Sequence, residues 1–275
     1  MAFEAEVEQA KGLAVRAGSI LLDHYAKRSS VTWKAPGDPV TEADRVANDF
    51  LTKELHRAHP DDGVLSEEAP DDRSRLTKRR VWMVDPIDGT LEFVSHVGEF
   101  AVMIGLAVEG RSVAGVVYQP TTGRLYYAVE GGGAFVEHAG ARVRLSVSSE
   151  SDPSQATLAL SRSHQSARVD LVRRRLGISK TILSGSIGLK IGLICERRAD
   201  LYLQLGSRTH QWDICAPEVI LREAGGIATD AHNHPLIYNR SESRNLHGII
   251  AGNSAMHRLA VDAAGAVLGG GENGL

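Results

Sequence analysis

Hydrophobic residues near the start of the chain recur at alternating steps of four and three. This spacing places them on one stripe and predicts a long first helix that packs on a sheet. The stripe comprises Phe3, Val7, Ala10, Ala14, Ala17 and Leu21. A polar stretch rich in Pro and Gly, residues 34–39, then breaks the pattern. Thr41 is the expected N-cap of a second helix, which carries Val46, Phe50 and Leu55.

After Gly63 the pattern changes to short apolar runs separated by Gly and Pro. These runs predict strands over 81–84, 101–108 and 113–118, joined into a hairpin-rich sheet. Farther along, a short strand over 158–160 is followed by helices and further short strands, which predicts a layered α/β half. The expected helices span 166–176, 189–196 and 213–224.

The least regular segments in the middle of the chain are Gly131-Gly132-Gly133 and residues 148–153. We therefore expect a boundary near residue 145, between an N-terminal α+β half (1–145) and a C-terminal α/β half (146–268). The glycine-rich end, residues 269–275, is expected to be a flexible tail.

Composition narrows the classes of protein that fit this pattern. The 275 residues, 43% of them hydrophobic, suffice for one large domain or two modest ones. The formal charge of −3 lacks the basic excess that binding to long nucleic acid needs. Residues 1–6 lack the features of a signal peptide, and no segment has the apolar length that spans a bilayer, so we expect a cytoplasmic protein without a membrane partner. Cys195 and Cys215 are expected to be buried and reduced.

The most informative stretch is Val81-Trp82-Met83-Val84-Asp85-Pro86-Ile87-Asp88-Gly89-Thr90. A buried strand delivers two carboxylates three residues apart, and Pro86 would stiffen the loop so that both point to one place. Oxygen ligands suit a hard cation such as Mg2+, and the carbonyl of Ile87 would add another. Gly89 and Thr90 offer backbone N–H groups at an expected helix N-terminus, where a phosphate is favoured.

The residue types of this stretch also fit or exclude other kinds of site. A polar turn after a strand is the simplest alternative, because Asp, Pro and Gly are ordinary turn residues. An EF-hand calcium loop is excluded, since the twelfth position from Asp85 is His96 rather than Glu. The Asp-x-Asp arrangement of phosphatases with an aspartyl nucleophile is absent here, which favours attack by metal-bound water.

Two more acidic residues border apolar runs. Glu67 follows Val64-Leu65-Ser66, and a solvated surface loop is its alternative interpretation. Asp213 precedes the apolar run 214–221, where a helix N-cap belongs, and capping alone would explain it. A ligand role for either residue therefore requires the other acidic elements to lie nearby.

These motifs, taken together and in order, resemble the inositol monophosphatase superfamily. They are Ser66-Glu67-Glu68, then Asp85-Pro86-Ile87-Asp88-Gly89-Thr90, then Trp212-Asp213 followed by Glu223-Ala224-Gly225-Gly226. The resemblance extends from Pro39 to Asn253. Within the superfamily the chain is most similar to the 3'(2'),5'-bisphosphate nucleotidases, through Glu92-Phe93, Ser161-Arg162-Ser163-His164, residues 188–191 and residues 212–221. Leu91 departs from the polar residue expected before Glu92, which bears on substrate preference more than on chemistry.

The resemblance implies an α/β (α+β) fold, a layered αβαβα sandwich in which the N-terminal half carries most of the metal ligands. The implied ligands of two or three Mg2+ ions are Glu67, Asp85, the carbonyl of Ile87, Asp88 and Asp213. The implied catalytic residues are Asp44, Glu67 and Thr90, of which Asp44 and Thr90 help to hold or deprotonate the attacking water. Asp44 has an alternative role as the capping-box partner of Thr41, and both roles are compatible.

The implied substrate contacts come largely from the C-terminal half. They are Asp88, Gly89, Thr90, Ser161, His164, Ser186, Gly188, Lys190 and Asp213. Lys190 would neutralise the phosphate that is not cleaved, and a solvated helix lysine is its alternative. His164 is either a ligand contact or a structural histidine with satisfied hydrogen bonds.

The implied activity is hydrolysis of adenosine 3',5'-bisphosphate to AMP and phosphate by metal-activated water, without a covalent intermediate. Activation by Mg2+ and inhibition by lithium follow from the resemblance. Inositol monophosphate, a sugar bisphosphate and histidinol phosphate are alternative substrates. A non-catalytic protein that binds phosphate esters is the alternative from another class, and the intact acidic residues argue against it. The expected partner is a small phosphate ester, and homodimer formation is left open.

Overall fold

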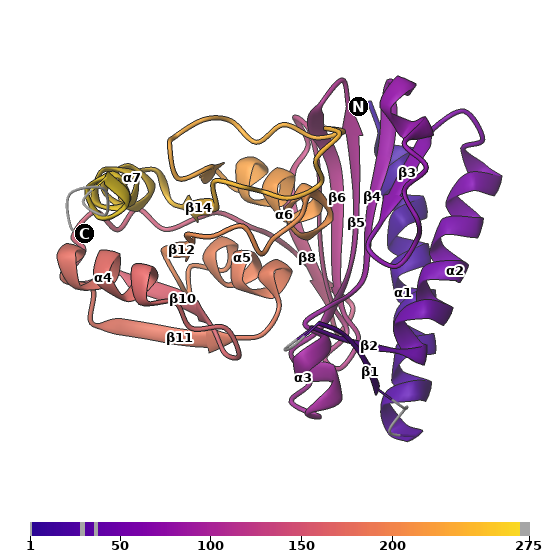
Figure 1. Cartoon of the computed structure of the whole chain (residues 1–275), viewed down its shortest axis with the longest axis horizontal. Coiled ribbons are helices and arrows are strands. Elements are labelled where there is room, and N and C mark those ends of the chain that lie inside the picture. The colour runs from indigo at the N-terminus through magenta and orange to yellow at the C-terminus, as the bar shows by residue number, and fades with distance from the viewer. Residues whose placement is uncertain (1, 28–30, 36–37, 270–275) are drawn as a thin grey trace.

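Five layers of helices and sheets make up the molecule (Figure 1). The computed structural model describes residues 2–27, 31–35 and 38–269. The layered αβαβα fold expected from the sequence is confirmed. From the N-terminal side, the helical layers are α1 (Glu4–Lys27) with α2 (Glu42–Ala58), then α5 (Ile187–Cys195) with α6 (Gln211–Glu223), then α4 (Ala167–Leu176) with α7 (Ser254–Gly269).

The larger sheet lies between the first two helical layers. Its strands follow chain order, with the first pair parallel and every later pair antiparallel. The hairpin-rich sheet predicted for this region is therefore confirmed. The strands are β3 (Gly63–Ser66), β4 (Arg80–Asp88), β5 (Ala101–Val108), β6 (Arg111–Gln119), β7 (Arg124–Val129), β8 (Gly133–His138) and β9 (Ala141–Arg144), with a short 3-10 helix, η1 (Ser74–Thr77), between β3 and β4.

The smaller sheet has the strand order β11-β10-β12-β14-β13 within the described residues. Its strands are β10 (Thr157–Ser161), β11 (Lys180–Ser184), β12 (Leu201–Gln204), β13 (Ile227–Thr229) and β14 (Ile249–Gly252). The two sheets meet in sequence between β9 and β10, and the division of the chain near residue 145 stays a prediction. Residues 270–275, most of the expected tail, lie outside the described residues, and Gly269 is the last residue of α7.

Buried apolar side chains form three clusters that hold the layers together. One joins α1 and α2 to the large sheet, a second surrounds α5 and α6 between the sheets, and a third joins the small sheet to α4 and α7. The predicted stripe of α1 is confirmed from Val7 onward, since Val7, Ala10, Ala14, Ala17 and Leu21 are all buried, whereas Phe3 precedes the helix and is half-buried. Cys195 and Cys215 are buried free thiols, as expected.

Glycines on the large sheet let α6 approach its backbone directly. Gly105 and Gly115 pair across β5 and β6. An added Cβ at Gly105 would lie 2.7 Å from Sγ of Cys215, and one at Gly115 would lie 2.5 Å from the carbonyl oxygen of Ala216. Because any side chain at these two positions would displace the helix, the glycines set the place of α6 on the sheet.

The second helix differs from its predicted pattern on one side. Thr41 is its N-cap and Leu55 is buried, as expected. Val46 is 36% exposed, however, and the buried face consists of Ala43, Ala47 and Leu51 with Leu55. Because α2 packs closely on α1, small alanines fill the contact between the two helices. The larger Val46, which the pattern predicted to be buried, lies outside that contact.

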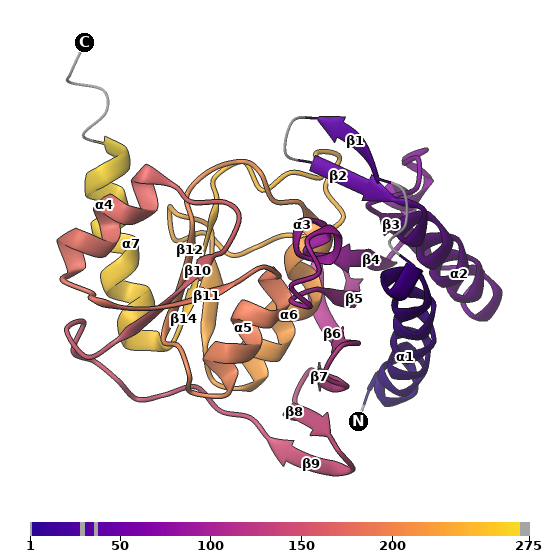
Figure 2. The ribbon, with the colours of Figure 1, turned by 90° about the horizontal axis from the view of Figure 1, so that it is seen from below.

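A two-stranded hairpin lies where the sequence predicts only a break. It consists of β1 (Val31–Ala35) and β2 (Asp38–Thr41), which are antiparallel. The intervening Pro36 and Gly37 lie outside the described residues. Figure 2 shows the hairpin beside α2 and α3. In the part of the chain that the structure describes, no helix is both long and apolar enough to cross a bilayer, and the cytoplasmic location stays a prediction.

Candidate active site

The first two acidic residues of the site lie at the end of β4. Asp85 and Asp88 are buried, 1% and 8% exposed. On a regular strand, residues three apart would face opposite sides of the sheet. Here the register with β5 shifts between them, because Asp85 pairs with Met103 whereas Asp88 pairs with Ala101. This bulge inserts one extra residue into β4 and turns both carboxylates toward one region.

Carboxylates from α2, β4, α6 and the end of β3 lie close enough to repel one another. Burial raises the pKa of Asp85 well above its usual value, and Glu67, Asp88, Asp213 and Asp44 raise it further. Burial also raises the pKa of Asp213, with added repulsion from Glu67 and Asp88. The structure therefore brings together the acidic residues that the sequence motifs single out.

Asp213 is the third residue of α6 and not its N-cap, so the N-cap position expected from the sequence is wrong. The helix begins at Gln211 with His210 as N-cap, because Gln211 and Trp212 already have helical backbone before the apolar run starts. The Asp213 carboxylate accepts a 2.7 Å hydrogen bond from the backbone N–H of His210. The Asp85 side chain lies close enough to affect the pKa of Asp213, so carboxylates from β4 and α6 are neighbours.

Glu67 is half-buried at the end of β3. Its backbone N–H donates a 3.1 Å hydrogen bond to the carbonyl of Val84, which continues the pairing with β4 by one residue. The preceding Ser66 is buried and donates a 2.6 Å hydrogen bond to Oδ1 of Asn48 in α2. Glu67 thus lies at the edge of the acidic cluster instead of in a loop that projects into solvent.

Asp44 has the capping role expected from the sequence, and its role toward the attacking water stays a prediction. Its Oδ2 accepts hydrogen bonds of 2.7 and 2.6 Å from the backbone N–H and the hydroxyl of Thr41, which completes the predicted capping box. Its Oδ1 lies 3.4 Å from the hydroxyl of Thr90, and that hydroxyl is 3.1 Å from the carbonyl oxygen of Ile87. One carboxylate therefore holds the start of α2 and faces the end of β4.

Gly89 turns the chain from β4 into α3 (Thr90–Val94) and is the N-cap of that helix. Its φ of 100° lies in the left-handed region, and an added Cβ would lie 2.8 Å from the carbonyl oxygen of Glu99. Both facts require glycine here. The helix N-terminus predicted at Thr90 is confirmed.

Asp88 connects the large sheet to the start of α5. Its Oδ2 accepts a hydrogen bond from the hydroxyl of Ser186 and a 2.8 Å hydrogen bond from the N–H of Gly188. Ser186 is also the N-cap of α5, because its Oγ accepts a 3.1 Å hydrogen bond from the N–H of Leu189. Ser186 and Gly188, two of the expected substrate contacts, are thus held beside this carboxylate.

Lys190 is 1% exposed, so the alternative of a solvated helix lysine is wrong. Its ammonium donates hydrogen bonds of 3.1 and 2.8 Å to the carbonyls of Ser184 and Gly185. Burial lowers its pKa to about 8, against the opposing effect of Asp88, Glu92, Glu99 and Asp213. Lys190 is therefore a buried cation that faces several carboxylates.

Two further acids tie α3 and its following loop to the expected substrate segment, and the sequence gives them no site role. Glu92 is 3% exposed and accepts a hydrogen bond from the hydroxyl of Ser163. Glu99 accepts hydrogen bonds of 2.8 and 2.6 Å from Arg162 and one of 3.0 Å from the N–H of Gly185. Glu92 is the one acid in the otherwise apolar Leu91–Val94 run, and this was the one local signal of its contact with Ser163. The two residues lie too far apart in sequence for a local pattern to pair them.

The side chain of His164 is exposed. Its Nδ1 lies 3.4 Å from Nη1 of Arg208, and its backbone N–H donates a 3.1 Å hydrogen bond to Oγ of Ser161. Both alternatives for His164, a ligand contact and a structural histidine with satisfied hydrogen bonds, stay predictions. Ser161 and His164 form a turn that is held by its own hydrogen bond.

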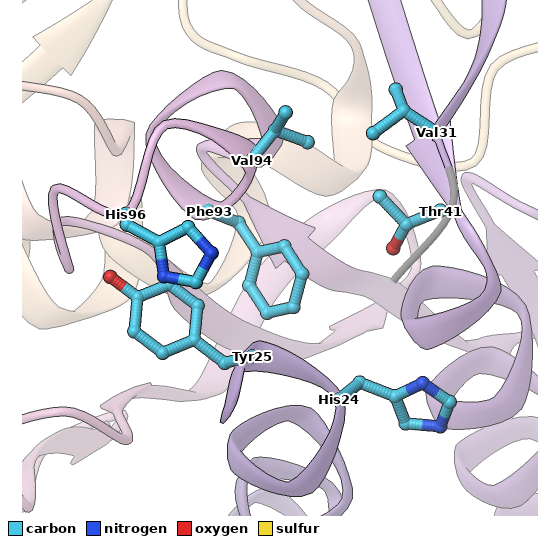
Figure 3. A pocket seen from close by; sticks show the side chains of 7 residues that line it. All are labelled: His24, Tyr25, Val31, Thr41, Phe93, Val94 and His96. Carbon is cyan, nitrogen blue, oxygen red and sulfur yellow. The ribbon is translucent and has the colours of Figure 1, made fainter. Parts of the chain in front are cut away.

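A cavity of about 150 Å³ lies beside α3, and the acidic residues are not among those that line it. Figure 3 shows the rings of Tyr25 and His96 facing each other next to Phe93, with Thr41 and Val31 on the opposite side. The centroids of the Tyr25 and His96 rings are 4.4 Å apart. Thr41 is the link between this cavity and the site, because it also binds Asp44.

The chemistry of the donor set fits a hard divalent cation. The donors are oxygen atoms, they are largely buried, and their mutual repulsion would be relieved by positive charge. Among the described residues, however, no three His, Cys, Asp or Glu side chains are arranged to hold a metal ion. Asp85, Asp88 and Asp213 accept hydrogen bonds from Ile87, Gly188 and His210 instead. The exact ligand set stays a prediction.

Comparisons with known proteins agree with this arrangement. The inositol monophosphatase family model matches residues 4–266. The chain is 34% identical to the 3'(2'),5'-bisphosphate nucleotidase CysQ of Aggregatibacter actinomycetemcomitans over 84% of this chain and 86% of that protein. It is 35% identical to inositol monophosphatase 2 of Homo sapiens over 85% of this chain and 82% of that protein. The solved structure of the extragenic suppressor protein suhB of Bartonella henselae matches with a TM-score of 0.82 and 28% identity, over 95% of this chain and 98% of that chain.

Proposed function

The chain belongs to the inositol monophosphatase family, and we propose on this premise that it is a Mg2+-dependent phosphatase acting on small phosphate monoesters. The resemblance read from the acidic motifs is thus confirmed at the level of the family. The proposed substrate is adenosine 3',5'-bisphosphate, which would yield AMP and phosphate. Similarity to a protein named as a 3'(2'),5'-bisphosphate nucleotidase supports this choice.

The observation that carries the proposal is the meeting of carboxylates from separate elements in a buried place. Asp85 and Asp213 lie 128 positions apart in sequence, 213 − 85, yet the Asp213 carboxylate raises the pKa of Asp85, and Glu67 and Asp88 raise the pKa of both. A cluster of buried acids is costly in the absence of positive charge, so it is seldom retained without a function. A divalent cation bound there would supply Lewis-acid chemistry and a water of lowered pKa.

The residues around the cluster would orient the attacking water and the phosphate. The Thr90 hydroxyl lies between the carbonyl of Ile87 and Oδ1 of Asp44, where it would donate its hydrogen to Asp44 and accept one from the water. The N–H groups at the start of α3 would face the phosphate oxygens. No nucleophilic side chain is needed, so no covalent intermediate is expected.

Substrate choice would depend on the C-terminal half. Lys190 supplies a buried positive charge near Asp88 and Asp213, which suits a second phosphate. His164 lies on the exposed segment that Glu92 and Glu99 tie to α3, and its Nδ1 is 3.4 Å from Nη1 of Arg208, which lies between β12 and α6. An inositol monophosphate is the second candidate substrate, because inositol monophosphatase 2 is similarly related.

The test is phosphate release by the purified protein in Mg2+ on adenosine 3',5'-bisphosphate, inositol 1-phosphate and fructose 1,6-bisphosphate, with and without lithium. The nucleotide should lead in kcat/KM by at least about tenfold, a difference of about 1.4 kcal/mol in transition-state binding. Lithium should inhibit that activity. A lead by inositol 1-phosphate would keep the phosphatase and overturn the nucleotide as substrate. Binding of these esters without any phosphate release would indicate the non-catalytic alternative.

A further inference from the structure

A segment between β13 and β14, residues 237–245, contacts two separate elements of the acidic site. We call this segment the strap. At one end it binds Arg75 in η1, which follows the Glu67-bearing end of β3. At the other it binds Gln211, the first residue of α6, two positions before Asp213. Both contact residues are fully buried, with Arg75 at 1% and Gln211 at 0% exposure.

Arg75 joins the loop after Glu67 to the strap. Its guanidinium binds the Asp71 carboxylate at 3.1 and 2.7 Å, and Asp71 is four positions after Glu67. The same group donates a 2.9 Å hydrogen bond to Oδ1 of Asn239 in the strap. Asn239 donates back through Nδ2 to the carbonyls of Arg75 and Lys78, at 3.0 and 3.3 Å. The loop and the strap are thus joined by hydrogen bonds in both directions.

Gln211 joins the strap to the start of α6. Its side-chain amide nitrogen, Nε2, donates a 2.8 Å hydrogen bond to the carbonyl of Glu242. Its Oε1 accepts one of 3.2 Å from the N–H of Arg240. Its own backbone N–H donates a 2.8 Å hydrogen bond to the carbonyl of Ser243. The backbone and the side chain of Gln211 therefore both hold the strap to the start of α6.

Arg75 and Gln211 share one hydrogen-bond acceptor in the strap. The carbonyl oxygen of Arg240 accepts hydrogen bonds from Nη1 of Arg75, at 3.1 Å, and from Nε2 of Gln211, at 3.4 Å. A shift of the strap would leave buried donors of both residues unsatisfied, which is unfavourable. The position of the loop after Glu67 is consequently coupled to the position of α6 through this carbonyl.

We infer that the strap sets the separation between Glu67 and Asp213, with Arg75, Asn239 and Gln211 as positioning residues for cation binding. The inference rests on the proposed function, because it concerns the same carboxylates. These residues touch neither substrate nor reacting atoms. Loosening the strap should therefore weaken cation affinity, while kcat at saturating Mg2+ is largely retained.

The test uses Asn239→Ala and the more conservative Asn239→Asp, which keeps an acceptor for Arg75 but loses the two donated hydrogen bonds. Asn239 is half-buried and its φ of 56° lies in the left-handed region, which Asp tolerates better than Ala, so Asn239→Asp is the less strained variant, and thermal unfolding verifies that both fold. Binding of Mn2+ without substrate is followed by electron paramagnetic resonance of the free ion, and Mg2+ activation is measured separately. The Mn2+ dissociation constant and the half-activating Mg2+ concentration should both rise about tenfold.

Asn253→Ala is the matched control. Asn253 is 2% exposed and makes a similar set of hydrogen bonds, donating to Ser148 and Glu150 and accepting from Met256, without contact to the strap. This variant should lose stability and keep wild-type Mn2+ affinity. Equal weakening of Mn2+ binding in the control, or wild-type affinity in both Asn239 variants, would overturn the inference alone. A wild-type protein that neither binds Mn2+ nor releases phosphate would overturn the proposed function and the inference with it.

Discussion

The hydroxyl of Thr90 lies 3.4 Å from Oδ1 of Asp44, a residue 46 positions earlier in the chain. The other oxygen of that carboxylate caps α2 through Thr41. Under the proposed function, turnover and helix capping would use different atoms of one side chain, and substitutions at Thr90 and Thr41 should separate them.

Thr90→Ala should lower kcat by about 10²-fold or more, because it removes the hydroxyl that links the water to Asp44. Thr90→Ser keeps that hydroxyl and should restore most of the rate. Thr41→Ala should act mainly on stability, at a cost of about 1 kcal/mol, because it removes a helix cap. Steady-state kinetics and thermal unfolding of the three variants test this division. A Thr90→Ala enzyme with normal kcat would contradict the role of the hydroxyl.

Asp88→Asn should reduce turnover by orders of magnitude, because it removes a charge from the cation site. It should also lower the melting temperature modestly, since Asp88 holds the start of α5 through Ser186 and Gly188. Ser186→Ala is the control, as it removes one of these hydrogen bonds and keeps the charge. Near-normal activity of Asp88→Asn would refute the acidic cation site.

Lys190→Met should raise KM for a bisphosphate more than for a monophosphate, because the buried charge is lost. Equal effects on both substrates would remove Lys190 from the second phosphate.

The pH dependence of the wild type gives a separate check on Lys190. Its folded-state pKa of about 8 is below the usual 10.5, so between these values the unfolded chain holds more protons than the folded one. The contribution of Lys190 to stability therefore increases as pH rises through this window. The charge itself is lost, so KM for the bisphosphate should rise above about pH 8 in the wild type and stay flat in Lys190→Met.

Stabilisation by Mg2+ should grow with pH. The pKa values of Asp85 and Asp213 are raised in the folded protein, so the folded state holds more protons and the cation-free protein loses stability as pH rises through those values. Mg2+ competes with these protons and relieves the repulsion that remains. Melting temperatures measured with and without Mg2+ should therefore differ more at about pH 8 than at about pH 5. An equal gain at both values would argue against cation binding at these carboxylates.

Local patterns in the sequence predicted most of the fold and the acidic residues of the site. The strand that ends in Asp85 and Asp88 and the cap at Thr41 depend on neighbouring residues, and the structure has both. Contacts between distant segments gave no such pattern. Glu92 with Ser163 is one example, and the hydrogen bonds that Glu223 accepts from the N–H groups of Gly131 and Gly133 are another. Such contacts depend on how the layers pack, which periodicity does not encode.

The direct contact of α6 with Gly105 and Gly115 has a mechanical consequence. By sequence α6 belongs to the predicted C-terminal half, but it packs on β5 and β6, where Gly105 and Gly115 leave no room for a side chain of their own. A rotation of one half against the other would therefore leave α6 with the first half. Asp213 would travel with Asp85 in any such rotation, whereas Ser161, His164 and the small sheet would swing relative to both. The spacing between Asp85 and Asp213 would be kept in such a rotation, because both residues would stay with the large sheet.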